Sequence, residues 1–166
     1  MSPTRTLLLM MLLFASSGMT AAYADGPNAV YDKNCALCHQ RGGTGVSGQF
    51  PRLAGRVGAI AASDAGRRYL LDVLLFGMAG QVDVDHVLIV GVMPSFAALS
   101  DEELASVLNY VTHLDGAAQK PEVKPGVLSA VDVAGARAAQ KLSATQVNQM
   151  RDSVPGLKAI NKKGTR

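Results

Sequence analysis

The sequence predicts a small all-α domain with one short β-hairpin and a helical extension at its C-terminal end. Helical periodicity of apolar residues runs through most of the chain, and three serine-initiated capping patterns mark helix starts in its second half. The stretch 81–91 departs from this periodicity because it alternates and is rich in β-branched residues. A proline-punctuated segment, KPEVKPG, then separates the last two helical patterns from the rest.

The first 24 residues have the features of a secretory signal peptide. Arg5 precedes an apolar run at 7–14, and the small-residue sequence AYA ends at Ala24, before Asp25. The apolar run is shorter than the roughly 20 residues that a membrane span needs, which favours cleavage over the alternative, an uncleaved anchor. We therefore expect residues 1–24 to be removed and the mature protein to lie in the periplasm.

Composition places the remaining chain among single-domain globular proteins. The formal net charge of the whole chain is +3, which is too mild to indicate a nucleic-acid partner. Beyond the signal, the longest apolar run is far too short to span a membrane. We expect a core domain at 25–115, followed by a linker and helical extension at 116–166.

Local patterns predict the elements of the core domain in order. A helix that starts at Pro27 delivers the two cysteines, and glycines with one proline predict a loop at 40–58. Helical periodicity returns at 64–78. The alternating stretch 81–91 predicts a hairpin with its turn near Asp85.

Three capping boxes predict the remaining helices. Ser100 and Glu103 open an amphipathic helix of about four turns. The same pattern occurs twice in the extension, where it predicts two more helices (130–140 after Ser129, and 144–152 after Ser143).

Cys35 and Cys38 are the only cysteines, and His39 follows them directly. A disulfide between them would close too small a ring to stabilise the fold much, and a thioredoxin-like pair needs a strand before the motif. A zinc site needs a second pair of ligands. Covalent haem attachment suits this spacing, because one helical turn presents both sulfurs to a porphyrin edge and the imidazole to its face. The motif therefore favours a covalently bound haem.

A haem bound in this way needs a second axial ligand or an open site, and Met93 is the candidate for that ligand. Pro94 pushes Met93 out of helical geometry, so we expect its thioether on an extended loop just before the helix that Ser100 opens. Other histidines and methionines are interpreted as surface residues and as core residues in helices, respectively (His86 and His113; Met78 and Met150).

The motifs CALCH, FPRLAG, VDVDHVLIVGVMPSF and SDEELASVLNYV together resemble the class I c-type cytochromes of bacteria. They are most similar to single-haem modules found alone or as electron-accepting parts of periplasmic dehydrogenases and reductases. The resemblance covers residues 27–115 and implies the class I cytochrome c fold, a small helical bundle around one haem c. It makes Cys35 and Cys38 the thioether sites, His39 the proximal iron ligand and Met93 the distal one.

The resemblance also implies roles for the loop after the motif. Pro51 matches the family's proline whose carbonyl accepts a hydrogen bond from the proximal histidine. The family commonly has glycine where this chain has Gln40, and a second proline where it has Arg52, which puts the loop conformation in doubt. Arg52 and Arg56 are interpreted equally as partners of haem propionates and as solvated loop arginines.

The function implied is one-electron transfer with a redox protein partner, without catalytic residues. The extension at 116–166 favours the electron-accepting cytochrome subunit or partner of a periplasmic dehydrogenase, and a free shuttle cytochrome is the alternative. A haem enzyme or gas-binding sensor with an open distal site is the rival from another class, and it requires that Met93 does not bind iron. An exported thiol protein without haem is the third hypothesis.

Overall fold

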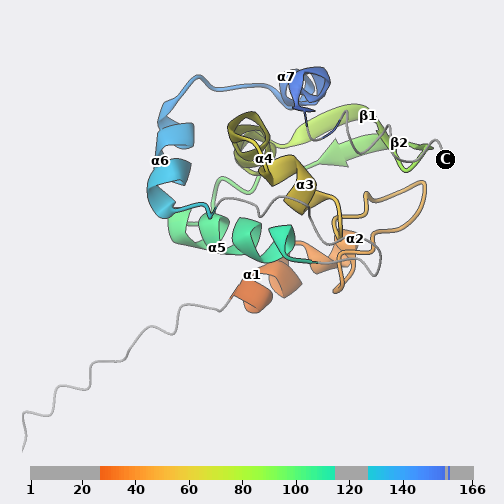
Figure 1. Cartoon of the computed structure of the whole chain (residues 1–166), viewed down its shortest axis with the longest axis horizontal. Coiled ribbons are helices and arrows are strands. Elements are labelled where there is room, and N and C mark those ends of the chain that lie inside the picture. Colours follow the sequence, from red (N-terminus) through yellow and green to blue (C-terminus); the bar gives the residue numbers. More distant parts are fainter. Residues whose placement is uncertain (1–26, 115–126, 156, 158–166) are drawn as a thin grey trace, which may run out of the picture.

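The computed structural model describes residues 27–114, 127–155 and 157, and the expected signal peptide and linker lie outside these residues. Its elements in chain order are α1 (Pro27–Asn34), α2 (Ala36–His39), α3 (Val57–Ala61), α4 (Asp64–Phe76), β1 (Met78–Val84), β2 (Val87–Met93), α5 (Asp101–Thr112), α6 (Ala130–Ala138), α7 (Ala144–Gln149) and the 3₁₀ turn η2 (Met150–Ser153). The mostly helical class with one small hairpin is confirmed (Figure 1).

Helix α4 lies at the centre of the bundle, where it contacts α3, α5, α6 and α7 (Figure 1). Helix α1 packs on α5, and the rings of Tyr31 and Tyr110 meet there with centroids 5.3 Å apart. Buried apolar side chains from α1 and α3 to α7 form one continuous cluster, which we call the main core (Val30, Tyr31, Val57, Ile60, Ala61, Tyr69, Leu70, Leu71, Val73, Leu74, Leu75, Leu104, Ala105, Val107, Leu108, Val111, Leu128, Val133, Ala136, Val147, Val154 and Leu157).

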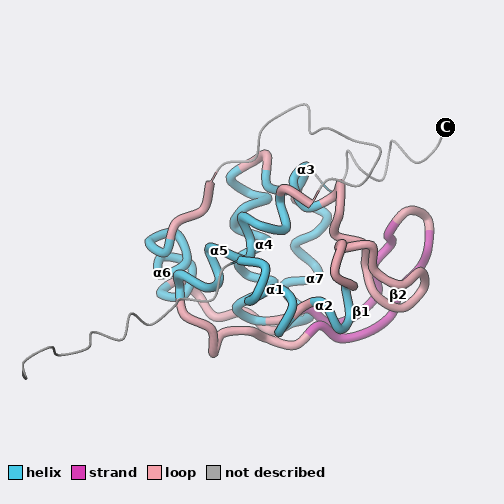
Figure 2. The backbone as a smooth tube through the Cα atoms, turned by 90° about the horizontal axis from the view of Figure 1, so that it is seen from below, coloured by secondary structure: helices cyan, strands magenta, loops and turns pink. Residues whose placement is uncertain are grey.

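Strands β1 and β2 form an antiparallel pair at one end of the bundle (Figure 2). The register runs from Met78 opposite Met93 to the closing pair at the turn. Asp85 and His86 make a two-residue turn, and both have positive φ (55° and 65°), as the tight turns of hairpins require. The predicted hairpin and its turn are confirmed, with strands that extend beyond 81–91.

All three predicted capping boxes are present. The side chains of Ser100, Ser129 and Ser143 each accept a hydrogen bond from the backbone N–H three residues on. The side chain of that third residue in turn accepts from the serine N–H, so two otherwise free helix donors are satisfied at each start. Helices α5, α6 and α7 therefore begin where their capping boxes predict.

The structure differs from the sequence prediction around Gly77. The predicted helix extended through Met78, and Met93 was expected on a loop. Helix α4 instead ends at Phe76, because Gly77 adopts a φ of 75° that side chains rarely tolerate. A Cβ at Gly77 would lie 2.6 Å from the Met93 carbonyl oxygen. Met78 and Met93 are therefore strand residues, paired at the open end of the hairpin.

Two further differences lie nearer the N-terminus. The predicted helix with the cysteines is interrupted at Cys35, between α1 and α2, where the Asn34 side chain donates to the Val30 carbonyl. Helix α3 was not predicted, because its glycine-rich surroundings indicated only a loop. Helix α3 packs on α5. Its Gly58 lies so close to the end of α5 that a Cβ there would be 2.7 Å from the Thr112 carbonyl oxygen.

The two helices of the extension pack back on the bundle. Helix α6 lies against α4 and α5, and α7 lies against α4 and β1. Arg137 of α6 donates to the Asp101 carboxylate at 2.8 Å and to the carbonyls of Ala97 and Leu99 at 2.7 and 2.8 Å. Apolar side chains of both helices belong to the main core, so residues 127–157 share it with the predicted core domain.

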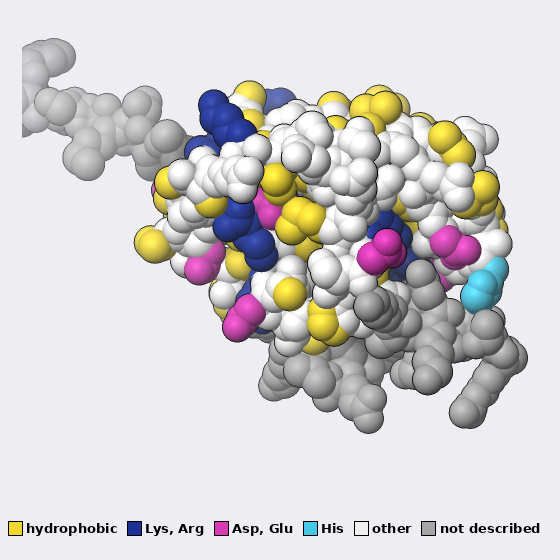
Figure 3. All heavy atoms as spheres, turned by 90° about the horizontal axis from the view of Figure 1, so that it is seen from above, with side chains coloured by type: hydrophobic (Ala, Val, Ile, Leu, Met, Phe, Trp, Pro, Cys, Tyr) yellow, Lys and Arg dark blue, Asp and Glu magenta, His cyan; other side chains and the backbone are white. Residues whose placement is uncertain are grey.

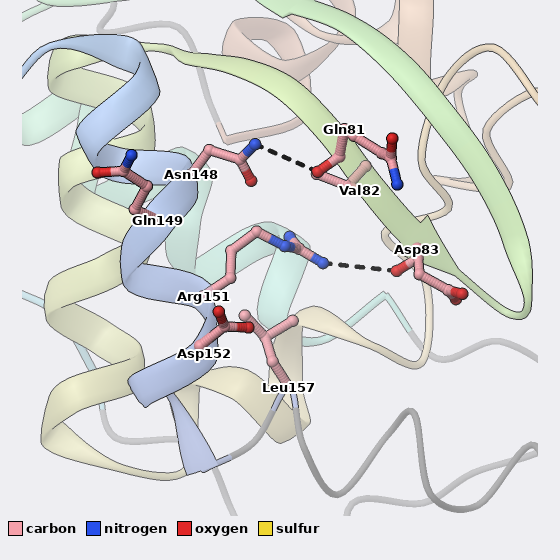
Figure 4. A pocket seen from close by; sticks show the side chains of 8 residues that line it. All are labelled: Gln81, Val82, Asp83, Asn148, Gln149, Arg151, Asp152 and Leu157. Atoms are coloured by element: carbon pink, nitrogen blue, oxygen red, sulfur yellow. Dashed lines mark hydrogen bonds between the residues drawn. The ribbon is translucent and has the colours of Figure 1, made fainter.

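Side chains of α7 and η2 cover the outer edge of β1, beside a pocket that these elements form with the strand (Figure 4). Asn148 donates to the carbonyls of Ala79 and Gln81, at 3.2 Å in both cases. Arg151 lies 3.5 Å from the carbonyl oxygen of Asp83. Within 27–114 and 127–157 no helix combines the length and apolar character of a membrane span.

Candidate functional site

Cys35 lies at the break between α1 and α2, and Cys38 lies within α2. Cys35 and Cys38 are both half-buried and carry free thiols rather than a disulfide. Burial, with a smaller contribution from neighbouring Cys38, raises the pKa of Cys35 to about 11. A redox-active CxxC pair needs the opposite, a thiol with a lowered pKa. The environment therefore disfavours the thioredoxin-like use of this pair.

His39 ends α2 and is buried, with 7% of its surface exposed. Its Nδ1 lies 2.8 Å from the Pro51 carbonyl oxygen, which can only accept, so Nδ1 carries the proton. The Nε2 atom then holds a lone pair and bonds to no described residue. Burial lowers the pKa of His39, although the bond to Pro51 opposes this shift. The predicted bond to Pro51 is confirmed, and it leaves a neutral imidazole oriented as a metal ligand.

The loop after His39 folds tightly over it. The Gly45 N–H donates to the His39 carbonyl at 2.9 Å, and the Phe50 N–H donates to the Val46 carbonyl at 2.8 Å. Gly45 has a φ of 66°, and a Cβ there would lie 2.4 Å from the Phe50 carbonyl oxygen. These contacts close the turn that brings Pro51 to the imidazole. Glycine at this position is required both by the backbone conformation and by the close approach.

Gln40 occupies the position where the resembling family commonly has glycine. Its backbone has φ 61° and ψ 156°, a region that is almost restricted to glycine. Three hydrogen bonds hold it there. Its N–H donates to the Ala36 carbonyl at 2.9 Å, and its carbonyl accepts from the Tyr31 hydroxyl at 2.6 Å and from the Gly43 N–H at 2.9 Å. Glutamine at this position therefore places a side chain on a strained backbone.

A carboxylate from the hairpin turn pairs with both loop arginines. Asp85 accepts from Arg52 Nε at 3.0 Å and from Arg56 Nη1 at 2.6 Å. Arg56 is only 4% exposed, so it is not a solvated loop residue. Partial burial acts to raise the pKa of Asp85, but hydrogen bonds and charges from the two arginines outweigh it and leave that pKa lowered. Sequence reasoning missed Asp85 because no local pattern relates it to arginines about thirty residues earlier.

Met93 lies on a different element from the CxxCH residues. It is half-buried at the end of β2 and packs against the main core, as Cys35 does. The segment after it is held to the end of α4, since Ser95 Oγ donates to the Leu75 carbonyl at 2.6 Å and the Phe96 N–H to the Leu74 carbonyl at 2.7 Å. Pairing to β1 before Met93 and these bonds after it hold the position of its backbone.

The two remaining histidines are both exposed. His86 is exposed in the hairpin turn, and His113 is exposed at the end of α5 with its Nδ1 2.7 Å from the Asn109 carbonyl oxygen. In the part of the chain that the structure describes, no three His, Cys, Asp or Glu side chains cluster as a metal site would. The donors at hand are an oriented imidazole, two half-buried thiols and a thioether. The chemistry of these donors fits a covalently attached haem.

Comparisons with known proteins indicate the same cofactor. A family model described as "Cytochrome C oxidase, cbb3-type, subunit III" matches residues 22–111. The chain is 44% identical over 155 residues to a cytochrome c-552 of Thermus thermophilus, covering 93% of this chain and 99% of that protein. It is also 46% identical over 125 residues to another Thermus thermophilus cytochrome c-552, covering 75% of this chain and 92% of that protein.

A third relative is a subunit of an enzyme. The cytochrome c subunit of alcohol dehydrogenase (quinone) from Gluconobacter oxydans (strain 621H) is 37% identical over 106 residues. The alignment covers 63% of this chain but 20% of that subunit. The similarity is therefore to one part of a much longer protein.

Proposed function

The chain belongs to the monohaem c-type cytochromes, and we propose that it carries single electrons between protein partners in the periplasm. Members of this family hold one haem c covalently, and its iron supplies the one-electron chemistry when the group is bound. The observation that carries the proposal is the orientation of His39, whose Nδ1 is committed to Pro51 at 2.8 Å. A ligand held in this way moves little when the iron changes charge, which favours rapid electron transfer.

We assign the two thiols to covalent attachment. Cys35 and Cys38 would each add an S–H across one vinyl group, with sulfur bonding to one carbon and hydrogen to the other, so no oxidant is consumed. Both thiols are free and half-buried beside the main core. Haem staining after denaturing electrophoresis tests the assignment: the stain should survive in the wild-type protein and be lost when both cysteines are replaced by alanine. Absence of stain from the wild type would favour the thiol protein without haem.

We assign Met93 as the distal ligand and His39 as the proximal one. A thioether favours the ferrous state and leaves the iron without an open coordination position. Met78 offers a matched control, because it lies directly opposite Met93 in the hairpin and is also a half-buried methionine. Its sulfur is engaged with the Tyr69 hydroxyl at 3.2 Å.

The ferric absorption spectrum distinguishes the two methionines. The far-red charge-transfer band of methionine bound to ferric iron should be present in the wild type, retained in Met78→Ala and lost in Met93→Ala. Carbon monoxide should bind the ferrous Met93→Ala protein rapidly and the wild type slowly. A wild-type protein that lacks the band and binds carbon monoxide rapidly would instead support the haem enzyme or sensor with an open site.

Two roles remain for the electron carrier, and we propose the free shuttle. The similarity to cytochrome c-552 spans nearly the whole of both chains, whereas the dehydrogenase subunit is matched over 20% of its length. Helices α6 and α7 also contribute to the main core, so the extension no longer favours the subunit role. If a dehydrogenase co-purifies with the native protein in a fixed ratio, the subunit role is correct and the shuttle is not.

A further inference from the structure

The outer edge of β2 differs from the outer edge of β1. The carbonyls of β1 that point away from β2 are covered by Asn148 and Arg151 (Figure 4). In an antiparallel pair, residues whose backbone N–H and C=O groups point away from the partner strand lie opposite one another. The partners of Ala79, Gln81 and Asp83 in the register are Val92, Val90 and Leu88, so the backbone groups of these three β2 residues point outward. Among the described residues, only β1 forms hydrogen bonds with the β2 backbone.

This edge is also apolar. The side chains of Leu88, Val90 and Val92 lie on one face of the strand and are 54%, 72% and 75% exposed. Hydrophobic side chains are visible on the surface at the end of the molecule where Figure 1 places the hairpin (Figure 3). We define the β2 edge as these three residues, with their outward backbone groups.

The usual protections of an exposed edge are missing from β2. Folded proteins keep free edges from pairing by placing charges, prolines or bulges in them. The strand VLIVGVM has no charge and no proline, and all seven of its residues pair with β1 in regular register without a bulge. An uncharged, regular and apolar edge of this length is well suited to pair with another strand.

We propose that the β2 edge binds the β2 edge of a second copy of this chain, forming a four-stranded antiparallel sheet across a two-fold axis. The strand is complementary to itself: with Val90 opposite Val90 of the second copy, Leu88 lies opposite Val92 in both directions. The outward N–H and C=O groups of all three residues then pair. Their side chains form one continuous apolar row on the shared face.

Charge and geometry both favour a second copy as the occupant. In this register Asp85 and His86 of one copy lie beyond Met93 of the other, where the segment 94–99 carries no charge. Like charges are therefore not opposed across the axis. Because the β1 edge is covered by α7, the described part of each molecule offers one free hairpin edge, so pairing closes at two copies rather than continuing into a fibre.

The association should be weak. One seven-residue strand pair contributes less than the roughly 1,200 Å² at which stable interfaces begin, so we expect a dissociation constant of about 0.1–1 mM. Sedimentation equilibrium of the haem-loaded mature protein between micromolar and millimolar concentration should show a monomer that converts to a dimer. Over the same range, hydrogen exchange at the N–H groups of Leu88, Val90 and Val92 should slow, while that of Ile89, which already faces β1, should not change.

Val90→Lys tests the edge, because it places two like charges opposite each other on the axis and should weaken dimerisation at least about tenfold. Gln81→Lys is the control: Gln81 lies opposite Val90 in the register on the same face, but on the covered strand. It should leave dimerisation unchanged. A protein that stays monomeric at millimolar concentration overturns the proposal, as does a dimer that Val90→Lys leaves intact. Pairing of the edge only with a different protein would also overturn it.

Discussion

Replacing Gln40 by glycine should stabilise the protein. The backbone of Gln40, at φ 61° and ψ 156°, lies in a region that costs a side-chain-bearing residue about 1–3 kcal/mol. Glycine removes that strain but adds about 0.5–1 kcal/mol of unfolded-state entropy. The three backbone hydrogen bonds of residue 40 remain, and the only side-chain bond lost is an exposed one of 3.4 Å to the Leu37 carbonyl. The expected net gain is about 1 kcal/mol.

Urea unfolding of the ferric, haem-loaded protein, followed by far-ultraviolet circular dichroism, measures this difference. In thermal unfolding of the same two proteins, the melting temperature should be about 4 °C higher for Gln40→Gly than for the wild type. Gln49→Gly is the matched control, because Gln49 lies exposed in the same loop with a φ that is not positive. It should lose about 0.5–1 kcal/mol. If Gln40→Gly is no more stable than the wild type, the strain assigned to this residue is wrong.

Three further predictions concern the rest of the fold. Asp85→Asn should lower the free energy of unfolding in urea by about 1 kcal/mol. This loss is smaller than that for breaking a fully buried ion pair, because Asp85 is partly exposed although Arg56 is buried. Folding lowers the pKa of Asp85 from 3.8, so the ionised carboxylate stabilises the folded protein above that pH, and this stabilisation is lost as the pH falls through the lowered pKa. Urea unfolding at a series of acid pH values should therefore show the wild type losing stability more steeply than Asp85→Asn. Gly66→Ala should cost about 2–3 kcal/mol in the same assay, because a Cβ would meet backbone at 1.7 Å, whereas Gly135→Ala in α6, with open space around it, should gain about 0.5 kcal/mol. Arg137→Ala removes three hydrogen bonds and should cost about 1–2 kcal/mol, with faster hydrogen exchange in α6.

Each of these predictions has a result that contradicts it. Equal acid sensitivity of the wild type and Asp85→Asn would show that the contacts with the arginines do not stabilise the fold. Equal effects of Gly66→Ala and Gly135→Ala would contradict the close approach of α4 to the chain before it. Unchanged exchange in α6 of Arg137→Ala would mean that apolar packing alone holds the extension in place.

Sequence reasoning succeeded where the signal is local. Ser100, Ser129 and Ser143 act on the backbone three residues away, so their capping boxes could be recognised without any knowledge of the fold. The same holds for the CxxCH motif and for the hairpin turn at Asp85. The bond from His39 to Pro51 was predicted only through the family resemblance. Glycines in the intervening turn allow many backbone conformations, so the residues alone do not predict where the turn places Pro51.

The sequence by itself determined the candidate donors: two thiols and an imidazole within five residues, and a thioether before a proline. Tertiary structure decided where that chemistry lies and what surrounds it. Met93 became a strand residue because Gly77 ends α4 and lets the Met93 backbone approach. Asp85 pairs with two arginines, α7 covers β1, and no described residue outside β1 pairs with β2. These contacts join segments that are distant in the sequence, so they depend on how whole elements pack and cannot be predicted from neighbouring residues.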